Sequence, residues 1–257
     1  MEICNISLRF LNVVEGFILI NYEDIVSQEL EAWRRKMYAK PNLFNQLSKK
    51  AQMKINNWIP EKAHRIITES IKNMVKATLV GSHVTTKKPE MQEMNLYQQD
   101  QLVKEKLSTY RKTATVEGAG TGAGGIFLGF ADFPLLLSIK MKFLFEAATI
   151  YGFDTKAYEE RLFLLHIFQL AFSNEKERKK TMYVIENWEH EKQHLLDMDW
   201  RAFQQEYRDY IDLVKLLQLV PGFGAIIGAY ANYNLLDHLG ETAMNAYRLR
   251  LLAVPEE

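Results

Sequence analysis

The sequence predicts an all-α fold, a multi-helix globular bundle with two glycine-rich apolar helical segments packed in its core. Three observations favour this class. Apolar residues recur at helical spacing through most of the chain after residue 21, and no run of alternating apolar and polar residues lies between hairpin turns. Two long, nearly uncharged stretches each begin in a glycine-rich segment. With 257 residues and 47% hydrophobic content, the chain is long enough to bury a substantial core.

The first helix is expected from Asn21 to the proline at position 41, because acidic residues gather at its start and basic residues at its end. A second helix follows Asn42. A third begins at Pro60, has apolar residues at i+4 spacing, and ends before Gly81.

The second half of the chain continues in helices. One is expected from residue 90 to residue 111, followed by TATVE (113–117), where a short strand is the alternative. An apolar helix then runs to Tyr151-Gly152. We expect Asp154 or Thr155 to cap the next helix, and Ser173 or Asn174 to cap the one after it. Another helix starts at 199, and the chain breaks at 221–222 before two shorter helices.

Charge and cysteine content exclude several classes. Lys plus Arg equals Asp plus Glu at 32 each, so net charge favours no nucleic-acid partner. The one cysteine, Cys4, allows no intrachain disulfide, and nothing implies an oxidising compartment. We therefore expect a cytoplasmic protein.

The first residues are as apolar as a signal peptide but lack its basic start and its cleavage site. Val14-Glu15-Gly16 can be encoded by a bacterial ribosome-binding sequence, with Leu19 as a TTG start codon. We hypothesise that residues 1–18 are a mis-called extension and that residues 19–257 form a single domain. The polar linker 82–90 is a candidate sub-boundary within it.

HEKQH (190–194) has the spelling of a zinc-protease helix. His190 and His194 lie one turn apart, and Glu191 stands where such enzymes place the general base. The flanking residues are highly charged, however, and Lys192 inside the motif would repel a metal dication. We therefore prefer a solvated helix face and expect no metal. Asp132 is the other candidate for a site, although a helix cap is the preferred interpretation.

Glycines after residue 117 allow two interpretations. Gly120, Gly122 and Gly125 match the dinucleotide fingerprint, but no buried strand precedes them, so we expect no nucleotide cofactor. The favoured alternative is close helix packing through G-x-x-x-G pairs. The residues concerned are Gly118, Gly120, Gly122, Gly124, Gly125 and Gly129, with Gly224 and Gly228 near the C-terminus.

These glycines belong to two segments, 118–139 and 216–236, each about as long as the ~20 residues that cross a bilayer. Polar residues and prolines in both segments favour burial in the protein core over membrane insertion or full spans.

The stretch from 33 to 60 is basic, contains no acidic residue and interleaves aromatic side chains. That composition suits an anionic membrane surface, while an ordinary cationic helical hairpin is the alternative. The residues expected to contact lipid headgroups are Trp33, Arg34, Arg35, Lys36, Lys40, Lys49, Lys50, Lys54 and Trp58.

GAGTGAGGIFLGFADFPLLLSIKMKFLFEAATIYGFD, LVPGFGAIIGAYANYNLLDHLGETAMNAYRLR and PEKAHRIITESIKNMVKA together resemble the EcsC protein family of Firmicutes. The resemblance covers the chain from Asn21 on, and HEKQH is not part of the family pattern. It implies a protein encoded with an ABC exporter, that is, an ATPase and its membrane subunit, and it supplies no catalytic residues.

We therefore expect a non-enzymatic accessory protein at the cytoplasmic membrane face, associated with an ABC exporter. Two alternatives stay open. One is a metal-dependent or other hydrolase with a site near His190, Glu191 and His194 or near Asp132. The other is a soluble protein-interaction module.

Overall fold

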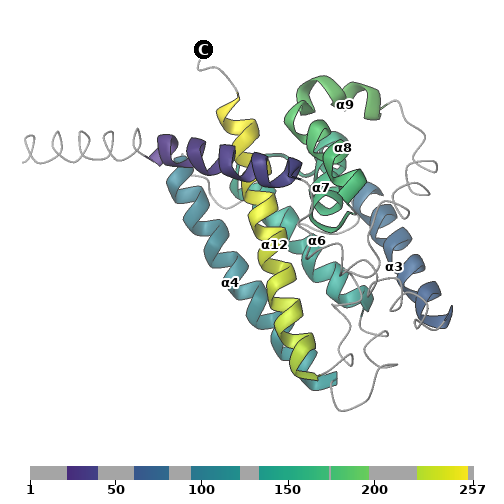
Figure 1. Ribbon diagram of the computed structural model, residues 1–257. Coiled ribbons are helices and arrows are strands. Elements are labelled where there is room, and N and C mark those ends of the chain that lie inside the picture. Colours follow the sequence, from purple (N-terminus) through teal and green to yellow (C-terminus); the bar gives the residue numbers. More distant parts are fainter. Residues whose placement is uncertain are drawn as a thin grey trace, which may run out of the picture.

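The structure, a computed structural model, describes residues 22–39, 61–80, 94–121, 133–173, 175–196 and 225–253. All regular elements in these ranges are α-helices, which confirms the predicted all-α bundle (Figure 1). They are a helix at 22–38, α3 (Glu61–Val80), α4 (Leu96–Thr121), α6 (Phe133–Ile150), α7 (Tyr158–Phe172), α8 (Glu175–Glu186), α9 (Trp188–Leu196) and α12 (Ala225–Leu252).

Helix α12 is the centre of the arrangement, because it contacts α4, α6, α7 and α8. Helices α4 and α12 form a long pair, and α3 packs on α6 at the opposite side of the bundle (Figure 1). The helix at 22–38 lies across the pair, where α4 begins and α12 ends (Figure 1). Its buried side chains, Val26, Leu30, Trp33 and Met37, recur at the spacing of one helical face.

Helix α4 differs from the prediction at both ends. It begins at Leu96, where Asn95 and Gln98 form a capping box: the Gln98 amide donates to Asn95 Oδ1 (2.9 Å) and the Asn95 amide donates to Gln98 Oε1 (3.0 Å). It continues to Thr121, so the short strand considered at 113–117 was wrong. The backbone stays helical through the β-branched residues there, whose helix propensity is lower than that of alanine but not prohibitive.

The turn between α6 and α7 also corrects a prediction. Gly152 has a φ of 90°, a conformation that favours glycine, so the expected end of the helix at Tyr151-Gly152 is confirmed. Neither Asp154 nor Thr155 caps α7, since the cap position is Ala157. Asp154 instead accepts the Lys156 amide (3.0 Å) within the preceding turn.

Helices α4 and α12 run antiparallel in a fixed register. Asp100 pairs with Arg248, Leu107 packs at Gly240, and Arg111 pairs with Asp237, so positions that rise along α4 fall along α12. The end of α4, which includes Gly118 and Gly120, and the start of α12, which includes Gly228, therefore lie at the same end of the pair (Figure 1).

Gly240 of α12 packs closely against Leu107 of α4. A Cβ built there would lie 2.5 Å from Cδ2 of the buried Leu107. Gly240→Leu is expected to lower the free energy of unfolding by roughly 1–3 kcal/mol, as overpacking does. Urea unfolding measures the change. The same substitution in a Leu107→Ala background supplies the matched control, and an equal cost in both backgrounds would contradict this packing.

Parts of the two glycine-rich segments lie within the described ranges. Phe133, Leu136, Leu137 and Ile139 of the first and Leu236 of the second are buried, and their helices α6 and α12 are in contact. Residues 122–132 and 216–224 lie outside the described residues, as do the linker 82–90 and the extension 1–18. Among the helices that the structure describes, none combines the length and apolarity that a bilayer crossing requires.

Candidate functional site

A buried ion pair joins α4 to α12. Asp100 is 0% exposed and Arg248 is 4% exposed. The Arg248 guanidinium donates to one carboxylate oxygen of Asp100 through Nε (2.9 Å) and Nη2 (2.6 Å). Its Nη1 donates to Glu29 on the helix at 22–38 (2.9 Å) and to Asn245 (3.1 Å). One arginine therefore connects three helices.

Two tyrosines complete the shell of Asp100. Tyr22 donates to Oδ2 and Tyr151 donates to Oδ1, each at 2.5 Å. Burial and the neighbouring carboxylate raise the pKa of both phenols, so they remain proton donors. Burial acts to lower the pKa of Arg248, but hydrogen bonds and the charge of Asp100 outweigh it and raise that pKa. The cluster is fully paired, as a structural clamp requires.

A second buried pair lies between α7 and α12. Glu160 accepts from the Tyr247 hydroxyl (2.7 Å) and from Arg250 Nη1 (2.7 Å). The guanidinium of Arg250 also stacks on two rings, 4.0 Å from the centre of Phe153 and 4.4 Å from that of Phe163. Burial raises the pKa of Glu160, while Arg250 and Tyr247 act to lower it. These groups pair with one another and so also fix the packing of the helices.

A charged cleft of about 550 Å³ opens between the helix at 22–38, α4 and α12. Most of its cations pair with its own carboxylates: Lys36 with Glu241 (3.1 Å) and Arg248 with Glu29. Trp33 also lines it, and its buried indole Nε1–H has no hydrogen-bond acceptor. The mixture of both signs gives this cleft no clear preference for a charged ligand.

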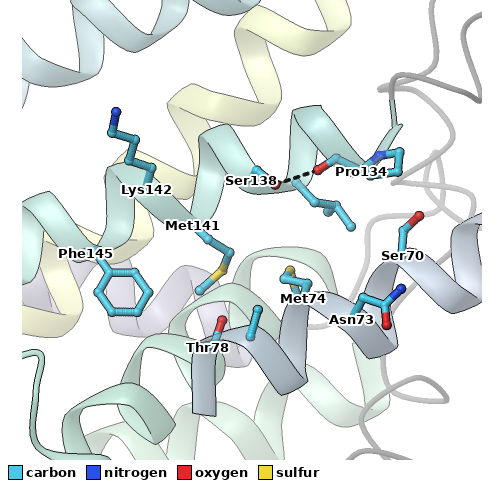
Figure 2. A pocket seen from close by; sticks show the side chains of 11 residues that line it. Ser70, Asn73, Met74, Thr78, Pro134, Ser138, Met141, Lys142 and Phe145 are labelled. Atoms are coloured by element: carbon cyan, nitrogen blue, oxygen red, sulfur yellow. Dashed lines mark hydrogen bonds between the residues drawn. The ribbon is translucent and has the colours of Figure 1, made fainter. Parts of the chain in front are cut away.

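A second cleft, of about 340 Å³, lies between α3 and α6 and is predominantly apolar. Figure 2 shows Met74 and Thr78 of α3 opposite Met141 and Phe145 of α6. The lining residues are Ser70, Asn73, Met74, Ala77, Thr78, Pro134, Leu137, Ser138, Met141, Lys142 and Phe145. None of them is acidic, so the cleft has the character of a small-molecule site with one cation at its edge.

The residues predicted to contact lipid headgroups differ in their environments. Trp33 is 3% exposed and packs in the core, so it does not face outward. Arg34 donates to Glu186 (2.6 Å), and Lys36 donates to Glu241 in an ion pair at the surface. Arg35 is exposed and forms no ion pair with a described carboxylate. Lys40, Lys49, Lys50, Lys54 and Trp58 lie outside the described residues.

The HEKQH stretch, for which a solvated helix face was preferred over a zinc site, forms most of α9. His190 and His194 are exposed, Glu191 is partly exposed, and Lys192 pairs with Glu189 on the same helix. Within the part of the chain that the structure covers, no three potential ligands come together. Asp132 lies outside the described residues, as do Gly122, Gly124, Gly125, Gly129 and Gly224.

The sequence analysis did not identify the charged residues that form ion pairs in the core. Asp100 shares a helical face with Leu96, Val103 and Leu107, and Arg248 shares one with Met244. A charged residue within an apolar stripe at i±3 or i±4 spacing indicates a buried polar group. That signal was present, but a single helix does not reveal which partner neutralises the charge.

The fold and the clefts define a class: a helical-bundle protein whose core is locked by buried ion pairs and whose described helices border an apolar cleft and a charged cleft. Residues 24–252 match the model of the EcsC protein family, and the chain belongs to that family. It is 53% identical to Protein EcsC of Bacillus subtilis (strain 168) over 228 residues. This alignment covers 89% of this chain and 95% of that protein.

A second relative from the same organism is the Uncharacterized protein YdbA. It is 33% identical over 141 residues, 53% of this chain and 52% of that protein. No solved structure matches the chain.

Proposed function

We propose that this EcsC-family protein is a non-enzymatic accessory protein that acts at the cytoplasmic membrane face together with an ABC exporter. The observation that carries the membrane contact is the stretch 33–60, which holds seven Lys and Arg residues and no Asp or Glu. Because the described part of the chain pairs Arg34 and Lys36 internally, the contact rests on Arg35 and on the lysines between 40 and 54.

The contact follows from electrostatics at the bilayer surface. An anionic membrane attracts each nearby Lys or Arg by ~1 kcal/mol, and interleaved aromatic rings favour the headgroup region. In the sequence these lysines lie between the helix at 22–38 and α3. The exporter's ATPase and membrane subunit are the proposed partners on the ground of the family resemblance. Recovery of both subunits with the tagged protein from detergent extracts is the expected result.

Flotation with liposomes tests the membrane contact. The full chain is expected to float with vesicles that contain phosphatidylglycerol and to stay behind with phosphatidylcholine alone. The triple variant Lys49→Gln, Lys50→Gln, Lys54→Gln should lose about 3 kcal/mol of attraction, which is ~100-fold in partitioning.

The matched control changes three exposed lysines elsewhere, Lys76→Gln, Lys104→Gln and Lys112→Gln, with the same loss of charge. This control should float like the wild type. Recovery of the wild type in the unbound fraction whatever the lipid charge would remove the basis of the proposal.

A further inference from the structure

The cleft between α3 and α6 is less polar than its residue types indicate. The Ser70 hydroxyl donates to the Ile66 carbonyl (2.6 Å), and the Ser138 hydroxyl donates to the Pro134 carbonyl (2.9 Å; Figure 2). Both hydroxyl donors are therefore satisfied within their own helices, because a helical serine at position i can donate to the carbonyl of residue i−4. What remains for a guest molecule is mainly thioether, ring and methyl surface.

The two methionines suit a flexible apolar guest. Met74 is 7% exposed and Met141 is 5% exposed, and they approach from opposite helices (Figure 2). Methionine has an unbranched, polarizable side chain that adapts to irregular partners. Phe145 and Leu137 close the apolar wall on the α6 side.

Lys142 supplies a positive charge at the edge of this cleft. Glu146, one helical turn further along α6, would be its natural intrahelical partner. That carboxylate instead pairs with Lys106 on α4 (2.7 Å). Among the described residues, no carboxylate forms an ion pair with Lys142, which is exposed. Figure 2 shows its side chain directed away from Met74 and Met141. An anionic head group held there would keep contact with water.

We propose that this cleft binds one long-chain fatty acid, with the carboxylate at Lys142 and the hydrocarbon chain between Met74 and Met141. Charge complementarity supports an anionic amphiphile, because the described lining residues include one cation, Lys142, and no acidic side chain. A volume of about 340 Å³ is near the lower end of the ~300–1,000 Å³ typical of ligand sites. That size favours a single acyl chain over the two chains of a membrane phospholipid.

Fluorescence titration of the delipidated full chain with cis-parinaric acid, without vesicles, tests the proposal independently of any membrane contact. We expect saturable 1:1 binding that palmitate and the uncharged hexadecanol both displace. Lys142→Gln should lower the affinity for palmitate by about tenfold, which corresponds to the loss of one hydrogen bond to a charged group. The affinity for hexadecanol should not change. Lys112→Gln, an exposed lysine on α4, should change neither.

A second variant tests the location of the chain. Ala77 lies at the exposed rim of the cleft, and Ala77→Trp should fill it and abolish binding of both competitors. Helix content from circular dichroism verifies that the variant folds. Absence of saturable binding by the wild type, equal palmitate affinity in Lys142→Gln, or unchanged binding by a folded Ala77→Trp variant would each overturn the proposal. Wild type without binding, combined with a lower Tm of Ala77→Trp, would show that the chain itself fills the cleft.

Discussion

Arg248→Met is expected to lower the free energy of unfolding by about 3–5 kcal/mol, because it leaves the fully buried carboxylate of Asp100 without its counter-charge. The two tyrosines would still donate to Asp100, but hydroxyl dipoles do not neutralise a buried charge. The connection from Arg248 to Glu29 would also be lost, so the helix at 22–38 should loosen from α12. Chemical denaturation measured by circular dichroism gives the change.

Arg35→Met is the matched control, since Arg35 is exposed and its side chain bonds only to the carbonyl of Glu31 among its described contacts. It should change stability by ~0.5 kcal/mol or less. The double variant Asp100→Leu, Arg248→Met should be more stable than Arg248→Met alone, because it removes the orphaned carboxylate. If Arg248→Met cost no more than Arg35→Met, the ion pair would not be the clamp described.

Lys140→Met is expected to stabilise the protein at pH 7. Lys140 is 1% exposed on α6, between the buried Leu136 and Leu144 one turn away on either side. No described residue pairs with its amine, and burial lowers its pKa to about 7. Because each pKa unit corresponds to ~1.4 kcal/mol, the substitution should raise the free energy of unfolding by roughly 4–5 kcal/mol at neutral pH.

The effect of Lys140→Met on stability should depend on pH. The folded-state pKa of Lys140 is lower than that of the unfolded chain, so the unfolded state binds more protons between about 7 and 10.5. Wild-type stability should therefore rise with pH across that range, and the advantage of Lys140→Met should be full below pH 7 and vanish near pH 10.5. Lys142→Met, an exposed neighbour on the same helix, should show neither effect. A pH-independent difference between Lys140→Met and the wild type would contradict the buried neutral amine.

The two predictions concern cations of similar burial with opposite expected results. Arg248 meets Asp100 across the α4–α12 register, and Lys140 meets no carboxylate within the described residues. The sequence places both within apolar stripes, so their burial was predictable. Which of them has a counter-charge depends on residues 148 positions apart, and no local pattern encodes that distance.

For the clefts, too, one part was predictable from local sequence and another depended on the tertiary structure. The apolar faces of α3 and α6 follow from their spacing in the sequence, and the end of α3 at Val80 before Gly81 was predicted correctly. The two faces leave a gap with Lys142 at its edge. This gap depends on how two helices about 70 residues apart in the sequence approach each other. The predicted lipid contacts illustrate the opposite error, since Trp33 resembles an interfacial residue in the sequence and is buried in the structure.

By itself the sequence determined the helical class, the places where several helices begin and end, and the resemblance to the EcsC family, because these depend on local periodicity, capping and motif spelling. Only the tertiary structure decided the antiparallel register of α4 and α12, the pairing of Asp100 with Arg248, the isolation of Lys140 and the cleft beside Lys142. Each of these is a relation between distant segments, set by side-chain packing and by the cost of burying an unpaired charge, which no single stretch of sequence contains.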